Sequence, residues 1–238
     1  MGQGTGRVAR PGGLRRPRPG TGGRGGLGGG GEPARGGADR VTVPASPSAG
    51  SARVRWGSVR AMAPDPWLVL VDLQRIFGAP GSPWAAPRFD AAAAVCAELL
   101  ERHAPRVVLT RFVAPAEPRG AWKPYYEQFP FALVPEDDPL YDLVDGFAGR
   151  DLPVLTRTTF GKWGPELAQV VGDAPIVVGG VSTDCCVLST VLPAADDGVP
   201  VTVVADACAG ASDADHERAL DAMRLYAPLV RVVTSADL

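Results

Sequence analysis

Histidine is almost absent from this chain of 238 residues, which contains only His103 and His216. Cysteine is scarce as well, and there is neither a CxxC pair nor a cluster of cysteine with histidine. Because zinc sites are built from such clusters, no metal site and no cofactor are expected. Adjacent Cys185 and Cys186 could form only a strained disulfide. We therefore expect reduced thiols and a cytoplasmic protein.

Long apolar runs are also missing. No window is long enough to span a membrane, and the first residues lack the apolar stretch of a secretory signal. The net charge is −2, yet residues 1–61 carry 11 Arg against Glu32 and Asp39. The remainder is therefore acidic, which argues against nucleic-acid binding. The expected partner is a small-molecule substrate, with neither nucleic acid nor membrane involved.

The chain divides into two parts by composition. Residues 1–61 hold 18 of the 30 glycines and show no apolar periodicity. Such a segment cannot bury enough surface to offset the entropy of ordering, so a disordered leader is predicted. Alternatively, translation starts at Met62 and the leader is not made. Residues 62–238 are long enough for one domain with its own core.

Within residues 62–238, apolar runs alternate with helix-like stretches. Strands are predicted at 67–71, 106–112, 154–156, 176–180, 201–205 and 230–234, and helices at 89–103, 165–171, 184–197 and 213–226. Strands that are apolar throughout, alternating with helices, indicate an α/β fold with a mostly parallel sheet covered on both faces. Residues 113–151 break this rhythm and are rich in Pro and aromatics, which favours a long functional loop. Pro193 falls inside a predicted helix, which must kink or shorten there.

The segment VVGGVSTDCCVLST, residues 177–190, is the most informative motif. It reads as a buried strand, a tight turn and the first turn of a helix. A thiol at such a helix start meets unpaired N–H groups and a partly positive helix end. This environment is expected to favour thiolate, the nucleophilic form of cysteine. The motif therefore predicts an enzyme with a cysteine nucleophile.

Three chemically useful side chains follow predicted strands. Asp72 ends the first strand, Arg157 follows the third and Cys186 follows the fourth. Ligands bind at the carboxyl ends of the strands in open parallel sheets, so these residues could provide base, cation and nucleophile. Asp206 also ends a strand, where a structural role in a turn is expected. Each residue alone has a plainer interpretation, such as a helix cap, a surface charge or a small buried thiol.

The motifs VLVDLQRIF, GKWGPEL, GVSTDCCVLST and VVADACAG together resemble those of the isochorismatase-like cysteine hydrolases. The resemblance covers roughly residues 67–234. It implies a three-layer α/β/α fold with a six-stranded parallel sheet and an Asp–Lys–Cys triad. By position, Asp72 and Cys186 match the aspartate and the cysteine. The family also places a non-proline cis peptide in the turn, which would be Val181–Ser182 here.

The third member of the triad departs from the family pattern. Judged by its spacing to Phe160 and Trp163, the family's lysine falls on Arg157. Arginine keeps the charge but cannot shuttle a proton. Lys162 lies five residues further on and is the alternative cation. We expect Arg157 by position and keep Lys162 as its rival.

The resemblance implies hydrolysis of a C–N bond in a small amide-like substrate. Asp72 would accept the proton of Cys186, and the thiolate would attack the carbonyl carbon to give a thioester. The N–H groups in the turn of Val181, Ser182 and Cys186 would hold the oxyanion. Aromatic side chains are expected to form the pocket wall; the candidates are Phe77, Phe112, Trp122 and Trp163.

Two subdivisions of the family fit less well. Nicotinamidases carry metal-binding histidines after the second strand, whereas this chain reads TRFVAPAEPRGAW there. Isochorismate hydrolases lack the nucleophilic cysteine. Two rival functions stay open: a catalytically silent ligand-binding member, made possible by Arg157, and a thiol redox sensor that uses Cys185 and Cys186. Relatives are commonly oligomeric, so a homo-oligomer is expected.

Overall fold

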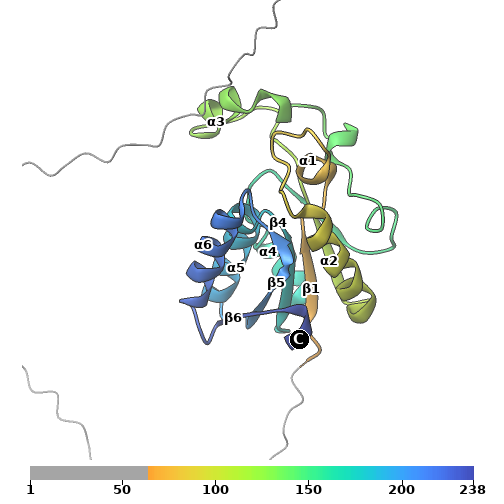
Figure 1. The fold of residues 1–238 in the computed structure, drawn as a ribbon, viewed down its shortest axis with the longest axis vertical. Helices are drawn as coiled ribbons and strands as arrows, with labels where there is room; N and C mark the ends of the chain where they lie inside the picture. The colour runs from red at the N-terminus through yellow and green to blue at the C-terminus, as the bar shows by residue number, and fades with distance from the viewer. Residues whose placement is uncertain (1–63) are drawn as a thin grey trace, which may run out of the picture. The chain divides into compact units, whose positions relative to one another are not determined.

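The computed structural model describes residues 64–238, so the predicted leader at residues 1–61 lies outside the described residues. Within these residues, six parallel strands form one sheet in the order β3-β2-β1-β4-β5-β6 (Figure 1). The strands are β1 Trp67–Val71, β2 Val107–Phe112, β3 Val154–Arg157, β4 Ile176–Val181, β5 Val201–Ala209 and β6 Val230–Val233. The predicted α/β fold with a six-stranded parallel sheet is confirmed.

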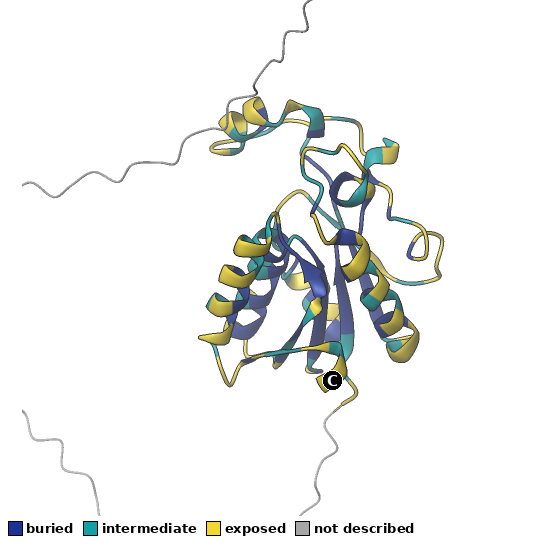
Figure 2. Ribbon diagram, viewed as in Figure 1, coloured by how far each residue is buried: buried dark blue, intermediate teal, exposed yellow. Residues whose placement is uncertain are grey.

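Helices cover both faces of the sheet, which makes three layers. They are α1 Arg75–Gly78, α2 Phe89–His103, α3 Trp122–Gln128, α4 Pro165–Val171, α5 Leu188–Asp196 and α6 Asp213–Arg224. On one face, Leu68 and Leu70 of β1 pack with Leu99 of α2. On the other face, Val69 and Val71 share a core with α4, α5 and α6. Figure 2 shows this as buried strands between helices whose outer faces are exposed.

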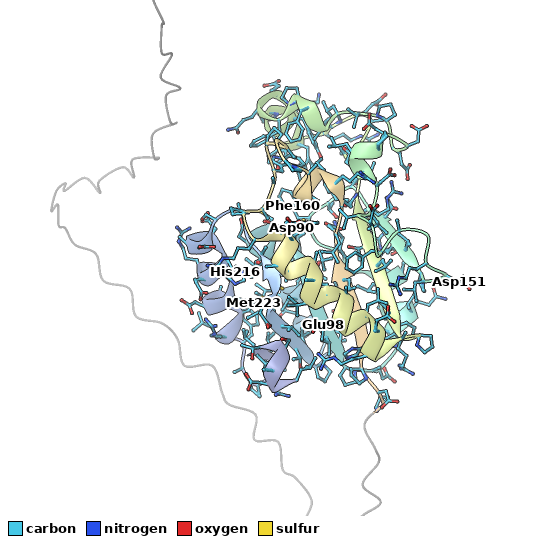
Figure 3. All side chains as sticks on the ribbon, turned by 45° about the vertical axis from the view of Figure 1, so that its right-hand side comes forward. Asp90, Glu98, Asp151, Phe160, His216 and Met223 are labelled. Atoms are coloured by element: carbon cyan, nitrogen blue, oxygen red, sulfur yellow. The ribbon has the colours of Figure 1, made fainter. Side chains whose placement is uncertain are left out.

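Alternation along β1 explains the two cores. Successive side chains of a strand point to opposite faces, so a run of apolar residues supplies both. The same layering appears in Figure 3, where Asp90 and Glu98 lie on α2 and His216 and Met223 lie on α6. Within residues 64–238, no helix is both long and apolar enough to cross a membrane.

Most predicted elements agree with the structure to within a few residues. Ser212 caps α6 as expected, because its side chain accepts a hydrogen bond from the N–H of Asp215 at 3.1 Å. The predicted helix at 184–197 is different: Thr183–Val187 form a π turn and α5 begins at Leu188. β5 is also four residues longer than predicted. Pro193 lies inside α5, as expected.

The long segment at 113–151 is partly structured. It contains α3 and two short 3-10 turns, at Pro130–Ala132 and Pro139–Tyr141. In Figure 1 α3, which belongs to this segment, and α1 lie at the end of the sheet where the strands finish. The sheet order reverses between β1 and β4, which is where open α/β sheets form their ligand crevice.

Candidate active site

Asp72 follows β1 directly and is fully buried. Its backbone has φ +52°, in the left-handed region that few non-glycine residues adopt. Thr110 of β2 holds it twice: the Thr110 hydroxyl accepts from the Asp72 N–H at 3.1 Å and donates to Asp72 Oδ1 at 2.7 Å. Such a backbone persists only where surrounding contacts fix it, and here they aim a carboxylate at the ends of β1 and β4.

Lys162 forms an ion pair with Asp72 in the interior. Its Nζ lies 2.9 Å from Asp72 Oδ2, and both side chains are 0% exposed. The ammonium also donates to the carbonyl of Thr159 at 2.8 Å and lies 5.4 Å from the centre of the Phe112 ring. Removing one partner from a buried pair leaves an uncompensated charge, so these two residues depend on each other.

The segment that carries Lys162 is fixed against α5. The N–H of Lys162 donates to Thr190 Oγ1 at 2.9 Å, and the same hydroxyl donates to the carbonyl of Cys186 at 2.7 Å. Gly161 packs against the carbonyl of Ser189, where a Cβ atom would lie only 2.5 Å from the oxygen. One turn of α5 therefore positions both the lysine and the cysteine.

Arg157 does not join this cluster, which corrects its assignment as the site cation. Its guanidinium forms an ion pair with Glu166 of α4 and lowers the pKa of that carboxyl to about 2. The reason lies in the sheet order: β3 is an edge strand, and β2 separates it from β1. The chain after β3 turns back toward the centre, so that Lys162, the rival candidate, reaches Asp72.

Cys186 is 2% exposed and lies in the π turn that follows β4. Burial and the charge of Asp72 raise the pKa of its thiol well above the usual value, while Lys162 and the Ser182 backbone oppose that rise. The expectation that this position favours thiolate is therefore wrong: the surroundings of Cys186 favour the protonated thiol. A protonated thiol beside a carboxylate is instead suited to proton transfer during attack.

The turn between β4 and α5 contains the cis peptide Val181–Ser182, as the resemblance implied. The carbonyl of Ser182 accepts hydrogen bonds from the N–H groups of Cys185 and Val187, both at 3.1 Å. Gly180 makes the turn possible, because its φ is +116° and a Cβ there would lie 2.1 Å from the carbonyl oxygen of Val71.

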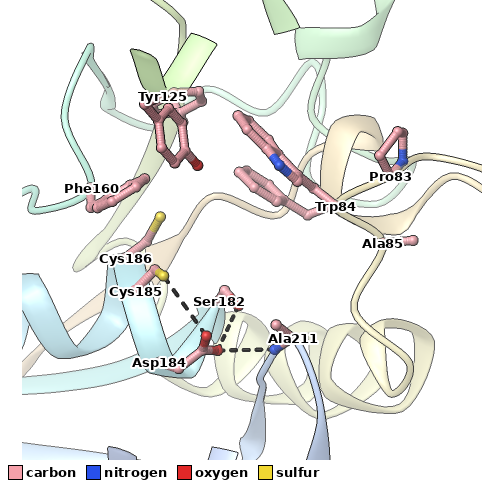
Figure 4. Close-up of a pocket in the computed structure, with 12 residues that line it drawn as sticks. Pro83, Trp84, Ala85, Tyr125, Phe160, Ser182, Asp184, Cys185, Cys186 and Ala211 are labelled. Atoms are coloured by element: carbon pink, nitrogen blue, oxygen red, sulfur yellow. Dashed lines mark hydrogen bonds between the residues drawn. The ribbon is translucent and has the colours of Figure 1, made fainter. Parts of the chain in front are cut away.

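A cavity of about 140 Å³ opens over Cys186 (Figure 4). Of the four predicted wall residues, Phe77 and Phe112 line it and Trp122 and Trp163 do not. Trp122 packs against Phe160 with 5.0 Å between ring centres, and Trp163 donates its Nε1–H to Asp197 at 2.5 Å. The remaining lining residues are Pro83, Trp84, Ala85, Tyr125, Phe160, Ser182, Asp184, Cys185 and Ala211.

Several contributing residues were not predicted from the sequence. Thr110 and Thr190 are buried hydroxyls inside apolar elements, and that unusual placement is the signal that could have found them. Gln74 belongs to the DLQ motif: its amide nitrogen donates to the carbonyls of Phe112 and Tyr141, and its oxygen accepts from the Phe112 N–H. It joins the ends of β1 and β2 below the cavity wall.

The remaining predicted residues have structural surroundings. Cys96 and Cys208 are buried in the core, as expected. Asp206 accepts hydrogen bonds from the backbone and hydroxyl of Ser235, so it holds a distant turn rather than the one that follows it. Among residues 64–238, no group of three His, Cys, Asp or Glu side chains is arranged to hold a metal ion.

Comparison with known proteins places this geometry in context. The family model described as "Isochorismatase domain" matches residues 66–237. "Isochorismatase domain-containing protein 2" of Xenopus laevis is 36% identical over 102 residues, which cover 41% of this chain and 46% of the relative. The protein of the same name from Macaca fascicularis is 33% identical over the same length. The chain thus spans about half the length of the curated relatives it matches.

Solved structures share the fold. A cysteine hydrolase from Pseudomonas syringae pv. phaseolicola 1448A superposes with a TM-score of 0.64 at 20% identity, covering 72% of this chain and 89% of that one. An isochorismatase family protein from Desulfovibrio vulgaris subsp. vulgaris str. Hildenborough gives a TM-score of 0.62 at 23% identity, covering 70% and 92%. At these identities the likeness concerns the fold alone.

Proposed function

Because the chain belongs to the isochorismatase domain family, we propose that it is a metal-independent cysteine hydrolase that cleaves a C–N bond of a small amide-like substrate. The observation that carries this proposal is the fully buried Asp72–Lys162 pair, 2.9 Å apart, whose charges act on the thiol of Cys186, a residue that lines the cavity. A nucleophile, a base and a fixed cation are the parts that acyl transfer requires.

In the proposed first half-reaction, Asp72 accepts the proton of the Cys186 thiol while the sulfur attacks the carbonyl carbon. A C–S bond forms and the carbonyl electrons move onto oxygen. Lys162 stays protonated and stabilises the negative charge that develops on the sulfur. When the tetrahedral intermediate collapses, the C–N bond breaks and Asp72 returns the proton to the leaving amine.

In the second half-reaction, water attacks the thioester carbon and passes its proton to Asp72. The C–S bond breaks, the acid leaves, and Asp72 returns the proton to sulfur. The N–H groups of Ser182 and Cys186 are the proposed oxyanion donors. Those of Cys185 and Val187 are less suited, since they already donate to the carbonyl of Ser182.

The two rival functions have less support. The silent-binder interpretation rested on arginine in place of lysine, and Lys162 removes that reason. A redox sensor needs thiols that ionise readily. Here burial raises the pKa of Cys185 to about 11, and that of Cys186 is raised as well.

The test compares the two adjacent thiols as matched variants. In a screen of small amides for ammonia or amine release, Cys186→Ala is expected to reduce kcat/KM by on the order of 10³-fold or more, because the nucleophile is lost. Cys185→Ala should retain most of the activity, because its thiol contacts Asp184 at 3.7 Å rather than the Asp72–Lys162 pair.

Equal losses from the two variants would contradict the choice of Cys186. No turnover of any amide by the wild type, together with unchanged ligand binding in Cys186→Ala, would favour the silent binder. A peroxide-dependent mobility change without turnover would favour the redox sensor. Activity lost to a chelator and restored by metal would contradict metal independence.

A further inference from the structure

The cavity over Cys186 has an aromatic wall whose rings pack against one another. The rings come from separate segments and are those of Phe77, Trp84, Phe112, Tyr125 and Phe160. Trp84 is central: its ring stacks on Phe77 at 6.1 Å between ring centres and meets Phe112 edge-on at 5.9 Å. These mutual contacts fix the shape of the wall, so the cavity selects by size.

The size fits a single ring. The cavity measures about 140 Å³, close to the roughly 150 Å³ engineered apolar cavity that binds benzene. A substrate that places its carbonyl carbon at Cys186 would therefore have room for one six-membered ring, or an aliphatic group of that size, between Trp84 and Phe160 (Figure 4).

The side chains that line the cavity carry negative charge and no positive charge. Among residues 64–238, Asp184 is the only charged side chain that lines the cavity, and no Lys, Arg or His of this part of the chain lines it. The nearby cation Lys162 is 0% exposed and already paired with Asp72. An anionic group entering this cavity would lose its water and meet a carboxylate, with no lining cation to compensate.

The carboxylate of Asp184 is only partly used by the protein. Its Oδ1 accepts hydrogen bonds from Ser182 Oγ and from the N–H of Ala211, both at 2.9 Å. Its Oδ2 receives only the Cys185 thiol, at 3.7 Å. This oxygen therefore retains capacity to accept a hydrogen bond, and it carries negative charge beside the nucleophile.

We propose that the substrate carries a neutral or cationic acyl group the size of one ring, and that Asp184 is the residue that rejects anionic substrates. The proposal rests on the proposed hydrolase and names its substrate class. Asp184 acts on selectivity rather than on the bond-breaking steps. Its removal should alter the discrimination between substrates of equal shape and different charge.

The experiment measures binding by calorimetry to the full chain carrying Cys186→Ala, so that no ligand is consumed. Benzamide tests the size. Isophthalamide and 3-carbamoylbenzoate test the charge, because they have nearly the same shape and both offer a carboxamide. Benzamide is expected to bind, and isophthalamide is expected to bind at least tenfold more tightly than 3-carbamoylbenzoate.

Adding Asp184→Asn should reduce that ratio at least threefold, mainly by tightening the binding of the anion. Asparagine keeps an oxygen that can accept from Ser182 and Ala211. The matched control is Asp145→Asn, which removes an equal charge from a side chain that is 98% exposed and does not line the cavity. It should leave the ratio unchanged. Ala85→Lys adds a cation to the wall without disturbing Asp184 and should also favour the anion.

The proposal is overturned if the anion binds as tightly as isophthalamide, or if both Asp184→Asn and Ala85→Lys leave the ratio unchanged. Failure of benzamide to bind at millimolar concentration would overturn the assignment of size. Hydrolysis is measured separately as ammonia release by the wild type. Charge-selective binding without ammonia release would support the selectivity of Asp184 and contradict the proposed hydrolase. Ammonia release without a preference between the neutral and the anionic ligand would support the hydrolase and contradict the selectivity of Asp184.

Discussion

The Asp72–Lys162 pair is the residue-scale feature on which the site depends. Both side chains are completely buried, and each has a second anchor: Thr110 for the aspartate and the Thr159 carbonyl for the lysine. Buried charges of this kind are retained at a cost in desolvation, which hydrophobic residues of equal volume would avoid. Their retention here is consistent with a chemical task for the pair.

Lys162→Met is expected to lower kcat/KM by about 10²-fold or more and to move alkylation of Cys186 to higher pH. The reason is that Lys162 lowers the pKa of the Cys186 thiol against the effects of burial and Asp72. The measurement is the rate of iodoacetamide labelling of Cys186 as a function of pH, read by peptide mass.

Arg157→Met is the matched control, because it removes a positive charge that is paired with Glu166 outside the cluster. It should leave both readouts within about twofold of the wild type. If Lys162→Met unfolds the protein, the double variant Asp72→Asn/Lys162→Met removes both charges and should fold while staying inactive. A labelling profile that moves with Arg157 and not with Lys162 would reverse the assignment.

From the sequence, Asp72 and Cys186 could be placed in the candidate site, but Arg157 was favoured over Lys162, which is the cation that pairs with Asp72. Asp72 directly follows β1 and Cys186 lies in the turn after the neighbouring strand β4, so strand prediction was enough to bring them together. Lys162 comes from a loop after an edge strand, and the course of that loop depends on its contact with α5. Such contacts between segments are invisible to a spacing argument along the chain.

At the scale of elements, the site depends on a close approach between the loop before α4 and the first turn of α5. Gly161 faces the carbonyl of Ser189, and Lys162 bonds to Thr190 one residue further on. Pro193 lies four residues after Ser189 and has no N–H to donate to that carbonyl. The proline that conflicts with an ideal helix therefore lies in the turn that receives the lysine loop.

Gly161→Ala is predicted to reduce activity at least tenfold while the protein stays folded. The added Cβ would lie 2.5 Å from the carbonyl oxygen of Ser189, so the loop must move and take Lys162 away from Asp72. The control is Gly164→Ala in the same loop, where the nearest atom would be at an ordinary 3.4 Å. Hydrolysis rates and circular dichroism spectra check the pair, and equal activity in both variants would show that the loop tolerates the shift.

Strand and helix positions followed from the apolar runs because the central strands, β1 and β4 above all, are buried on both faces. The π turn at Thr183–Val187 did not follow, since a π turn and an α-helix bury the same sequence pattern. The sequence also did not predict that Trp122 and Trp163 lie outside the cavity lining. An aromatic-rich segment indicates a wall, but which rings face inward is decided by the packing of Trp84 and Phe160.

At the scale of the whole molecule, three buried thiols make stability sensitive to alkaline pH. Burial raises the pKa of Cys96, Cys186 and Cys208, the last to about 12. In the unfolded chain these thiols ionise near pH 8.5 to 9. At a pH between the thiol pKa of the unfolded chain and the raised thiol pKa of the folded protein, the unfolded state binds fewer protons than the native state. The free energy of unfolding therefore falls as pH rises through this range.

The expected slope is on the order of 1 kcal/mol per pH unit for each such thiol. Urea unfolding at pH 8, 9 and 10 measures it, and the midpoint should decline with pH. Cys208→Ala should give a shallower decline than the wild type, whatever its stability at pH 8. A midpoint that does not change with pH across this range would mean that the thiols are not shielded from solvent as the structure indicates.

The homo-oligomer expected from the resemblance stays a prediction.

The difference in exposure between the Asp72–Lys162 pair and Asp184 has a consequence for ionic strength. Dissolved ions screen charges that contact solvent and have little effect on those enclosed by protein. The pair is sealed, whereas Asp184 is only half-buried at the cavity. Raising salt from about 0.05 to 1 M should therefore leave kcat for a neutral amide nearly constant and weaken the discrimination against anions. Potassium chloride titration would thus separate the chemistry of this cavity from its selectivity without a single mutation.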